Sequence, residues 1–502
     1  MKHRALFIVL TLLLIILAGV GTMATTARHA DNAVVVTVPL DGAYPFTPAV
    51  DTRTGRMFVL AIAGPRRSPH SELRMLDTAT GALLRTLPLV YSAFSFGSTP
   101  VVDERTGRVV VTANSRIFLF DSRTGAPRTV ARASAQLNPS AQLNQITLDA
   151  AADRLYASNG MSFGWSCSGG GPTFTPTTST CMLSDATVSV LSARTGGVLR
   201  TLDLPQQGMT PLSIDSRGRR LVVAGGGPDS MPGTVSVFDA TTDRLLRNTQ
   251  LTQGVPTYGR PPVVDDKANR AYLVLERGAG SGWSGVMNPT PARTPTYTIA
   301  ILDTRTGRLM RTLTLGKSMP TPVAAADGGR FYIADSGPWR SVSISGGTGS
   351  RKSHFSVPSP LGSGRLYIRD ARTGALLGAV TVAPGPIAIA LDARQGRAYV
   401  LGRGMVDPAT NIAGPGMVDV VDIRSARVVR TIAVGSNAQS LLLDPAARRL
   451  LVMHAGSYLP APPHDPWSWL PGVLRQRLAF LPQGVPPRQL SPSLTILDTS
   501  HL

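Results

Sequence analysis

Short apolar runs separated by polar turns recur along nearly the whole chain. In the first example, a run ending at Val50 is followed by the turn Asp51-Thr52-Arg53-Thr54-Gly55-Arg56 and then by the apolar run 57–60. Two apolar runs joined by a short turn that contains Asp and Gly predict a β-hairpin. Close relatives of this turn make eight in all, and the other seven occupy residues 103–108, 149–154, 215–220, 265–270, 325–330, 392–397 and 444–449.

A second hairpin pattern follows each of these turns. Residues 73–87 give the clearest example, with a turn that begins at Asp77 between two apolar runs. Related turns begin at Asp121, Ser192, Asp239, Asp303, Asp370 and Asp422, and the last pattern breaks off at Asp498. Four strands in each repeat of about fifty residues predict a radial stack of small sheets, which is a β-propeller.

The two ends of the chain each carry part of one repeat. The eighth repeat stops after its third strand, at 494–497, whereas the stretch 33–39 has the apolar character of a fourth strand. Pairing of these two strands closes the ring and leaves no open sheet edge. The sequence therefore predicts an all-β, eight-bladed propeller that occupies residues 33–502 as one domain.

Long insertions interrupt four of the repeats, at residues 160–184, 278–295, 337–364 and 456–492. Each falls between the second and third strands of its blade, on the side of the ring where one blade is linked to the next. We call this the insertion side. The opposite side carries the tight turns that contain Asp, and we call it the turn side.

The aromatic residues are unevenly distributed. All five tryptophans lie within the insertions, and the links between blades on the same side add three further candidates: Trp165, Trp283, Trp339, Trp467, Trp469, Tyr44, Phe46 and Tyr258. Because Trp and Tyr supply much of the energy of binding interfaces, these residues form the candidate site for an unidentified protein or small-molecule ligand. The structural interpretation stays open, in which each tryptophan packs its own loop onto the blade.

The turn side is rich in arginine. The formal net charge of the chain is +20, and nearly all of its cations are arginines. Each first turn ends in an arginine such as Arg56, which can hold the hairpin by pairing with a turn Asp or with free carbonyl groups. Arginines outnumber the acids, so a positive field should remain. The expected partner is an anionic membrane surface, and nucleic acid, which would bind with a steep salt dependence, is a less favoured one.

The N-terminus has the pattern of an export signal. Lys2, His3 and Arg4 precede the uncharged run 5–24, as in a signal peptide or a membrane anchor, so residues 1–32 are assigned to signal or anchor plus linker. Cleavage near Ala24 or Ala27 would release the propeller, whereas the intact run is long enough to span a bilayer. Both outcomes stay open, and both place the propeller outside the cytoplasm, in the cell envelope or secreted.

The only two cysteines, Cys167 and Cys181, lie in one insertion. In an oxidising compartment they can close a local disulfide, with two free thiols as the alternative. Motifs for catalysis are weak. Residues 160–164 match the letters of a nucleophile elbow without its helix, and the histidines show no spacing typical of metal ligands. We therefore predict no cofactor, no metal and no catalytic residue from motifs, while a site assembled from separate blades stays open.

The repeats resemble those of the YVTN family of exported bacterial propellers, similar to the YncE group. The residues that carry the resemblance are 154–159, 397–400 and the Asp-Thr-Arg-Thr-Gly turn at 303–307. The resemblance implies a propeller and, since family members usually have seven blades, seven is the alternative to eight. It implies no single activity, because similar propellers include lactonase-like enzymes and subunits of amine dehydrogenases.

The predicted function is a non-enzymatic extracytoplasmic binding scaffold with its ligand on the insertion side. The alternative is a lactonase-like hydrolase, or the propeller subunit of an oxidoreductase, with its site at the mouth of the central channel.

Overall fold

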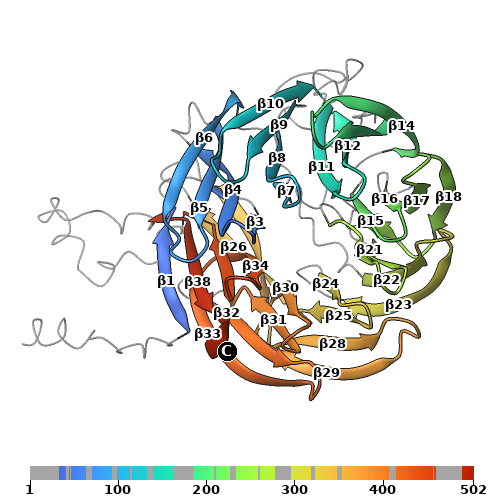
Figure 1. Ribbon diagram of the computed structural model, residues 1–502. Helices are drawn as coiled ribbons and strands as arrows, with labels where there is room; N and C mark the ends of the chain where they lie inside the picture. Colours follow the sequence, from blue (N-terminus) through green and yellow to red (C-terminus); the bar gives the residue numbers. More distant parts are fainter. Residues whose placement is uncertain are drawn as a thin grey trace, which may run out of the picture.

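The computed structural model is a ring of eight antiparallel sheets around a central axis (Figure 1). This arrangement confirms the prediction of an all-β propeller and selects eight blades over seven. The structure describes residues 33–40, 44–45, 47–63, 70–92, 99–113, 116–132, 141–162, 185–207, 211–226, 233–257, 260–277, 296–317, 323–337, 339–346, 353–405, 414–455, 457–458 and 489–502. The signal or anchor assigned to residues 1–32 therefore lies outside the described residues.

The first four blades follow one another along the chain, each running from the innermost strand outward. An extra two-residue strand, β2 (Tyr44–Pro45), pairs with β4 in blade one, as β3 also does. The strands of blades one to four are β3 (Ala49–Asp51), β4 (Arg56–Ala63), β5 (His70–Asp77), β6 (Leu83–Ser92); β7 (Val101–Asp103), β8 (Arg108–Ala113), β9 (Arg116–Asp121), β10 (Pro127–Arg132); β11 (Ala141–Asp149), β12 (Arg154–Ser162), β13 (Asp185–Ser192), β14 (Val198–Gln207); and β15 (Leu212–Asp215), β16 (Arg220–Gly225), β17 (Gly233–Asp239), β18 (Leu245–Leu251).

The last four blades repeat this order, with additions on the insertion side. The short strand β19 (Val255–Pro256) joins blade five, and two hairpins rise from blades six and eight, β26 (Trp339–Gly346) with β27 (Ser353–Pro360) and β36 (Ser457–Tyr458) with β37 (Gln489–Leu490). The strands of blades five to eight are β20 (Val263–Asp265), β21 (Arg270–Arg277), β22 (Thr296–Asp303), β23 (Leu309–Lys317); β24 (Val323–Ala326), β25 (Arg330–Asp335), β28 (Gly364–Asp370), β29 (Leu376–Val382); β30 (Pro386–Asp392), β31 (Arg397–Gly402), β32 (Pro415–Asp422), β33 (Arg427–Ser436); and β34 (Ala438–Asp444), β35 (Arg449–His454), β38 (Ser493–Asp498), β1 (Val34–Pro39).

The blades are held together by separate hydrophobic cores, one between each pair of neighbours. In blade four, Leu221 and Val223 of β16 pack against blade three, while Val222 and Ala224 pack against blade five. Successive residues of a strand point to opposite faces of its sheet, so a strand with an unbroken apolar run is buried on both faces. This explains why the second strands read as continuous apolar runs rather than as an alternating pattern.

The closing strand comes from the N-terminus, as the sequence predicts. Strand β1 pairs antiparallel with β38, with Val34 opposite Leu497 and Pro39 opposite Ser493. Val34 packs into the core between blades seven and eight, and Val36 packs into the core between blades eight and one. The first described residues of the chain therefore complete two of the eight cores.

A series of hydrogen-bonded polar groups crosses this closing blade. The buried His454 has Nδ1 at 3.2 Å from the carbonyl oxygen of Ser436 and Nε2 at 3.0 Å from Oγ1 of Thr495. The hydroxyl groups of Thr495 and Thr37 are 3.1 Å apart. Because the carbonyl can only accept, Nδ1 carries the proton and Nε2 accepts from Thr495, which leaves Thr37 to donate to Thr495. A neutral histidine thus supports the contact between β38 and β1.

This arrangement predicts that the seam of the ring, where β1 pairs with β38, becomes less stable in mild acid. Burial lowers the pKa of His454 from its ordinary value of 6.5. The unfolded chain therefore binds a proton at a pH where the folded chain does not, so the free energy of unfolding decreases as the pH falls below 6.5, by at most about 1.4 kcal/mol per pH unit. Denaturant unfolding between about pH 5 and pH 7.5 measures this slope.

The matched variants are His454→Gln, which removes the titrating group, and His501→Gln, which removes an exposed histidine at the C-terminus. The slope should diminish in the first variant and persist in the second. An unchanged slope in His454→Gln would contradict the assignment of the pH dependence to the seam.

Candidate functional site

The insertion side carries all four long excursions, as predicted from their positions in the repeats. They leave and rejoin the blades between β12 and β13, β21 and β22, β25 and β28, and β35 and β38, which are the second and third strands of blades three, five, six and eight. The second strand of each blade begins at a first turn and therefore ends on the side opposite the turns. The ring consequently has one elaborated side and one side built only from tight turns.

Most of the predicted aromatic site residues lie outside the described residues, namely Trp165, Trp283, Trp467, Trp469, Phe46 and Tyr258, together with Cys167 and Cys181. Two can be placed. The backbone of Tyr44 lies in β2, opposite Ile62 near the end of β4, and so on the insertion side. Trp339 begins β26, where it pairs with Pro360 of β27.

The base of the hairpin β26–β27 lies beside blade seven. A Cβ atom placed on Gly385 would lie 3.2 Å from Cγ of Pro360 and 3.8 Å from Cβ of Arg403. Arg403 follows β31 of blade seven, and its backbone N–H donates to the carbonyl of Gly385 at 2.9 Å. The partner strand of Trp339 therefore packs beside the start of the Arg403 side chain.

A second arginine belongs to the same region. Arg260 precedes the inner strand of blade five and is half-buried; burial lowers its pKa, and the positive charge of Arg403 lowers it further. The charge of Arg403 in blade seven therefore acts on Arg260 in blade five. Positive charge on this side of the ring suits an anionic or carbonyl-bearing group.

The inner strands around the central axis carry mainly small and aliphatic residues. Half-buried examples are Val50, Val102, Ile214, Val264 and Ala326. The acids at the ends of these strands are used in the turns. Seven of them are buried to 6 % exposure or less: Asp51, Asp103, Asp149, Asp215, Asp265, Asp392 and Asp444. Among the described residues there is also no group of three His, Cys, Asp or Glu side chains close enough together to hold a metal ion.

The buried acids fix the shape of the first turns. Asp103 is typical, because its Oδ1 accepts the backbone N–H groups of Arg105 and Thr106 at 3.1 and 3.3 Å. The turn is completed by Gly107 with φ of 67°, a conformation that glycine adopts without strain. These contacts confirm the hairpin signal and assign the Asp residues a structural role.

The arginine that follows each first turn is also engaged. In five blades it forms an ion pair with the acid of the second turn of its own blade, through Arg56–Asp77, Arg220–Asp239, Arg270–Asp303, Arg397–Asp422 and Arg449–Asp498. In the other three blades the arginine donates to a carbonyl of the next blade, through Arg108 to Ala193, Arg154 to Ala240 and Arg330 to Ile423. These arginines hold hairpins and blades together. This is the structural role predicted for them, by pairing with a turn Asp or with carbonyl groups.

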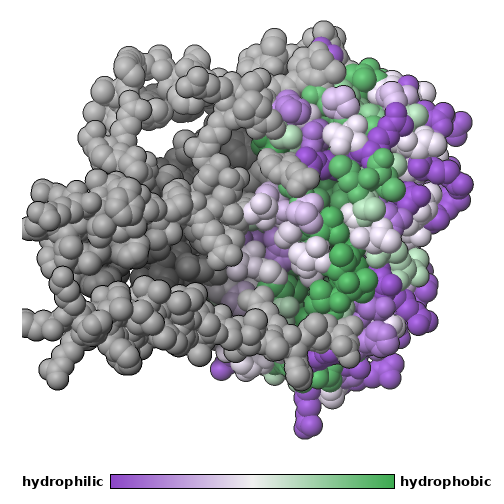
Figure 2. Space-filling view, turned by 90° about the vertical axis from the view of Figure 1, so that its left-hand side faces the viewer, coloured by the Kyte–Doolittle hydropathy of each residue, from purple (hydrophilic) through white to green (hydrophobic). Residues whose placement is uncertain are grey.

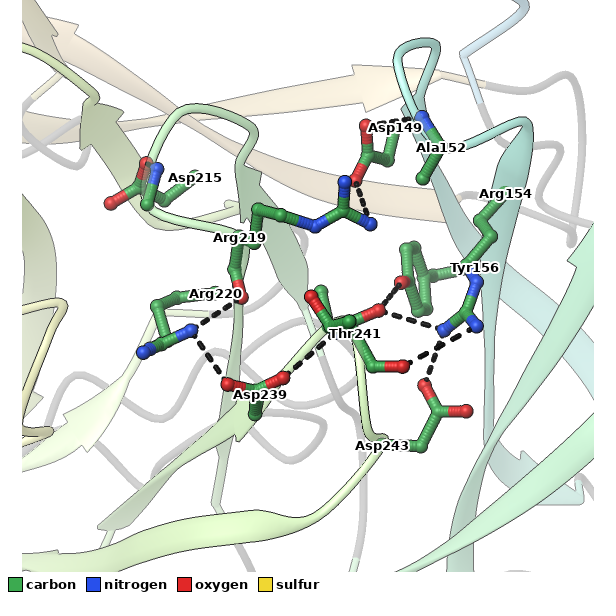
Figure 3. Close-up of polar contacts among 12 residues, drawn as sticks. Asp149, Ala152, Arg154, Tyr156, Asp215, Arg219, Arg220, Asp239, Thr241 and Asp243 are labelled. Carbon is green, nitrogen blue, oxygen red and sulfur yellow. Dashed lines mark hydrogen bonds and ion pairs between the residues drawn. The ribbon is translucent and has the colours of Figure 1, made fainter.

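Arg154 is one of the arginines that reach the next blade (Figure 3). Blade three has Ser192 where most blades have an acid, so Arg154 finds no carboxylate on its own second turn. It donates instead to the carbonyl of Ala240 at 2.7 Å and pairs with Asp243 at 2.9 Å, both on blade four. The hydroxyl of Tyr156 donates to the same Ala240 carbonyl at 3.2 Å.

The bridge from Arg154 to blade four was not predicted, although the sequence contains a signal for it. Asp243 occupies a turn position with φ of 60°, where Gly81, Gly125 and Gly307 stand in other blades. A repeat that lacks its usual acid is therefore followed by a repeat with an extra one. By contrast, nothing in the spacing indicates that the charge of Arg403 acts on Arg260, because the two residues are separated by two repeats.

A second set of arginines lies on the turn tips and is exposed. The third residue of the second turn is arginine in five blades: Arg123, Arg194, Arg305, Arg372 and Arg424. The turn side consists of the first turns together with the nine residues that begin at each second-turn acid or serine (498–502 in blade eight). These segments hold 29 Lys and Arg against 19 Asp and Glu, a net charge of +10. The positive field expected on the turn side is therefore present.

Substitution should separate the structural arginines from the exposed ones. Arg154→Gln removes a half-buried bridge between two blades, so we expect a loss of about 1.5–3 kcal/mol in the free energy of unfolding. Arg305→Gln removes the same charge from a turn tip and should change stability by no more than about 0.5 kcal/mol. Denaturant unfolding of both variants checks this, and equal losses would contradict the division into two classes.

Comparison with known proteins supports the fold and no closer relationship. No protein family matches the sequence, and no curated protein matches it. Among solved structures, the chain is similar to the Dos1 propeller, at 10% identity over 84% of this chain and 92% of that chain, with a TM-score of 0.53. It is also similar to the quinohemoprotein alcohol dehydrogenase from Comamonas testosteroni, at 12% identity over 94% of this chain and 78% of that chain, with a TM-score of 0.51. At these identities the similarity establishes a β-propeller.

Proposed function

We propose that this chain is a non-enzymatic extracytoplasmic scaffold that binds its partner or ligand on the insertion side. The observation that carries the proposal is the base of the hairpin β26–β27, where Trp339 pairs with Pro360, and Pro360 packs beside Gly385, whose carbonyl accepts from the backbone of Arg403 in blade seven. Aromatic and arginine side chains are the types most enriched at the centres of binding interfaces. The four long insertions leave the ring on the same side and can add contacts around this region.

The composition of this region supports a particular kind of ligand. The positive charge of Arg403 lowers the pKa of Arg260, so a negatively charged group that binds near Arg260 stabilises its charged form. The ligand we propose therefore presents a carboxylate, a phosphate or an acidic side chain to Arg260 and Arg403, with apolar surface for Trp339.

The extracytoplasmic location is part of the same proposal. It is supported by the basic N-terminus followed by the uncharged run 5–24 and by the resemblance of the repeats to the exported YVTN propellers. Among the described residues no helix is both long and apolar enough to cross a membrane, and the run 5–24 lies outside them. The pair Cys167 and Cys181 would be oxidised to a disulfide in this compartment.

A catalytic function remains the alternative proposal, as a lactonase-like hydrolase or the propeller subunit of an oxidoreductase. The observation that favours it is the same pair of arginines, because groups contributed by separate blades at a channel mouth can orient an anionic substrate. The two proposals differ in the outcome for a bound ligand, which is released unchanged by a scaffold and converted by an enzyme.

The test uses the full chain with two substitutions on the insertion side and one on the turn side. Proteins and small molecules retained from an envelope extract are identified with the wild type, and their affinities are then measured with Trp339→Ala, Arg403→Gln and the turn-side control Arg308→Gln. Loss of a central contact typically costs about 2 kcal/mol, so each insertion-side variant should bind roughly thirtyfold more weakly. The control should bind as the wild type does.

Equal affinities in all four proteins would place the partner elsewhere and refute the proposed site. Conversion of the retained small molecule by the wild type, lost in Arg403→Gln, would replace the scaffold by the enzyme.

A further inference from the structure

A repeated pair of aliphatic residues is exposed on the turn side of the ring. It stands at the seventh and eighth positions counted from the acid or serine that opens each second turn. Ten of the fourteen exposed large hydrophobic side chains in the described part of the chain occupy these two positions: Leu83, Leu84, Val198, Leu199, Leu245, Leu246, Met310, Leu376, Leu377 and Val429. Single exposed aliphatic residues are common, but repetition in six of the blades is a patterned surface.

These aliphatic pairs lie directly behind the turns. They occupy the first two residues of the outer strands in four blades, the second residue in blade five and the third residue in blade seven. Each strand residue advances about 3.3 Å, so they are within roughly 10 Å of the turn. Figure 2 views the ring from its rim. It shows hydrophilic residues along the right-hand edge and a band of hydrophobic residues next to them. The charged turns and the aliphatic pairs therefore belong to one continuous surface.

The arginines within the same segments add positive charge to that surface. Arg305, Arg372 and Arg424 occupy equivalent exposed positions on three consecutive blades, and no ion pair of their side chains occurs among the described residues. Arg85, Arg200 and Arg430 follow the aliphatic pairs and donate to a carbonyl of the next blade at 2.7, 3.5 and 2.6 Å. The outer arginines thus bridge neighbouring blades, while Arg305, Arg372 and Arg424 present their charge at the turn tips.

The start of the closing strand gives an independent indication. Val34 of β1 pairs with Leu497 at the end of β38, next to the last turn, so the chain enters the ring from the turn side. Only residues 25–32 separate this point from the uncharged run 5–24, a reach of at most about 28 Å. If the run stays in a membrane as an anchor, the turn side is the side held closest to that membrane.

From these observations we propose that the turn side docks onto the surface of an anionic lipid bilayer. The arginines of the turn tips pair with lipid phosphates, and the aliphatic pairs behind them enter the boundary between headgroups and acyl chains, where apolar side chains gain free energy. A nucleic acid would use the positive charge but offers little to exposed leucines and valines, and this favours lipid over nucleic acid.

The positive charge of the docking surface comes from arginine, which does not lose its proton. Two of the acids beside it are held ionised, since Arg128 lowers the pKa of Asp121 to about 2 and Ser500 does the same for Asp498. Docking should therefore vary with salt and with the fraction of anionic lipid.

The experiment uses the full chain reconstituted in bilayers, so that the N-terminal run is the same in every sample. Hydrogen–deuterium exchange is measured in phosphatidylcholine bilayers with and without about one third phosphatidylglycerol. We expect the segments 303–311, 370–378 and 422–430 to exchange at least threefold more slowly only in the anionic bilayer. Protection should disappear at about 1 M salt, where charges are screened within roughly 3 Å.

Two triple variants with the same change in net charge complete the test. Arg305→Gln, Arg372→Gln and Arg424→Gln together should abolish the protection, whereas Arg277→Gln, Arg340→Gln and Arg365→Gln, which are exposed arginines on the strands and hairpin of the insertion side, should preserve it. Equal protection in neutral and anionic bilayers, or loss of protection in both triple variants, would overturn the proposal. Stronger protection by duplex DNA than by anionic lipid at the same salt concentration would assign the surface to nucleic acid instead.

Discussion

The whole structure depends on the burial of both faces of every blade. A single four-stranded sheet with apolar residues on both faces is not stable in water, because it needs an apolar neighbour on each side. The cores between blades satisfy this need around the ring, and the last of them can form only if blade eight is complete. The N-terminal strand β1 therefore does more than hide an edge, since Val34 and Val36 belong to the cores on both sides of the seam.

Arginine is well suited to hold this ring together at its turns. Its guanidinium presents several donors in a fixed plane, so one side chain can bind a carboxylate and a backbone carbonyl at once. In Arg154, Nη1 donates to Asp243 and to the carbonyl of Ala240, while Nη2 donates to the carbonyl of Thr241 at 3.5 Å. A chain that uses arginine for structure at nearly every turn acquires a positive side as a consequence, before any selection for a charged partner. The exposed arginines at the turn tips therefore matter more for function than the total charge does.

The fold could be predicted from the sequence because its signals are local and repeated. In each turn, Asp, Gly and the flanking apolar runs indicate a hairpin. Eight repetitions remove the ambiguity of a single hairpin. The match between residues 33–39 and the missing strand was readable for the same reason. The contacts between blades were less accessible. The packing of Pro360 beside Gly385, and the position of His454 between Ser436 and Thr495, depend on how whole blades are rotated about the axis.

The two sides of the ring obey different constraints, and this difference shapes how they can function. On the turn side, a buried Asp, a residue with positive φ and an arginine bridge fix seven of the eight first turns, so changes there disturb the fold. On the insertion side, a connection can lengthen without affecting the blade, because the strands that flank it are already paired. New binding surface can therefore arise on the insertion side while the turn side keeps a constant arrangement of charge. A propeller held by its turn side to a membrane presents its variable side to the surroundings, and the two proposed surfaces can then act at the same time without competing for space.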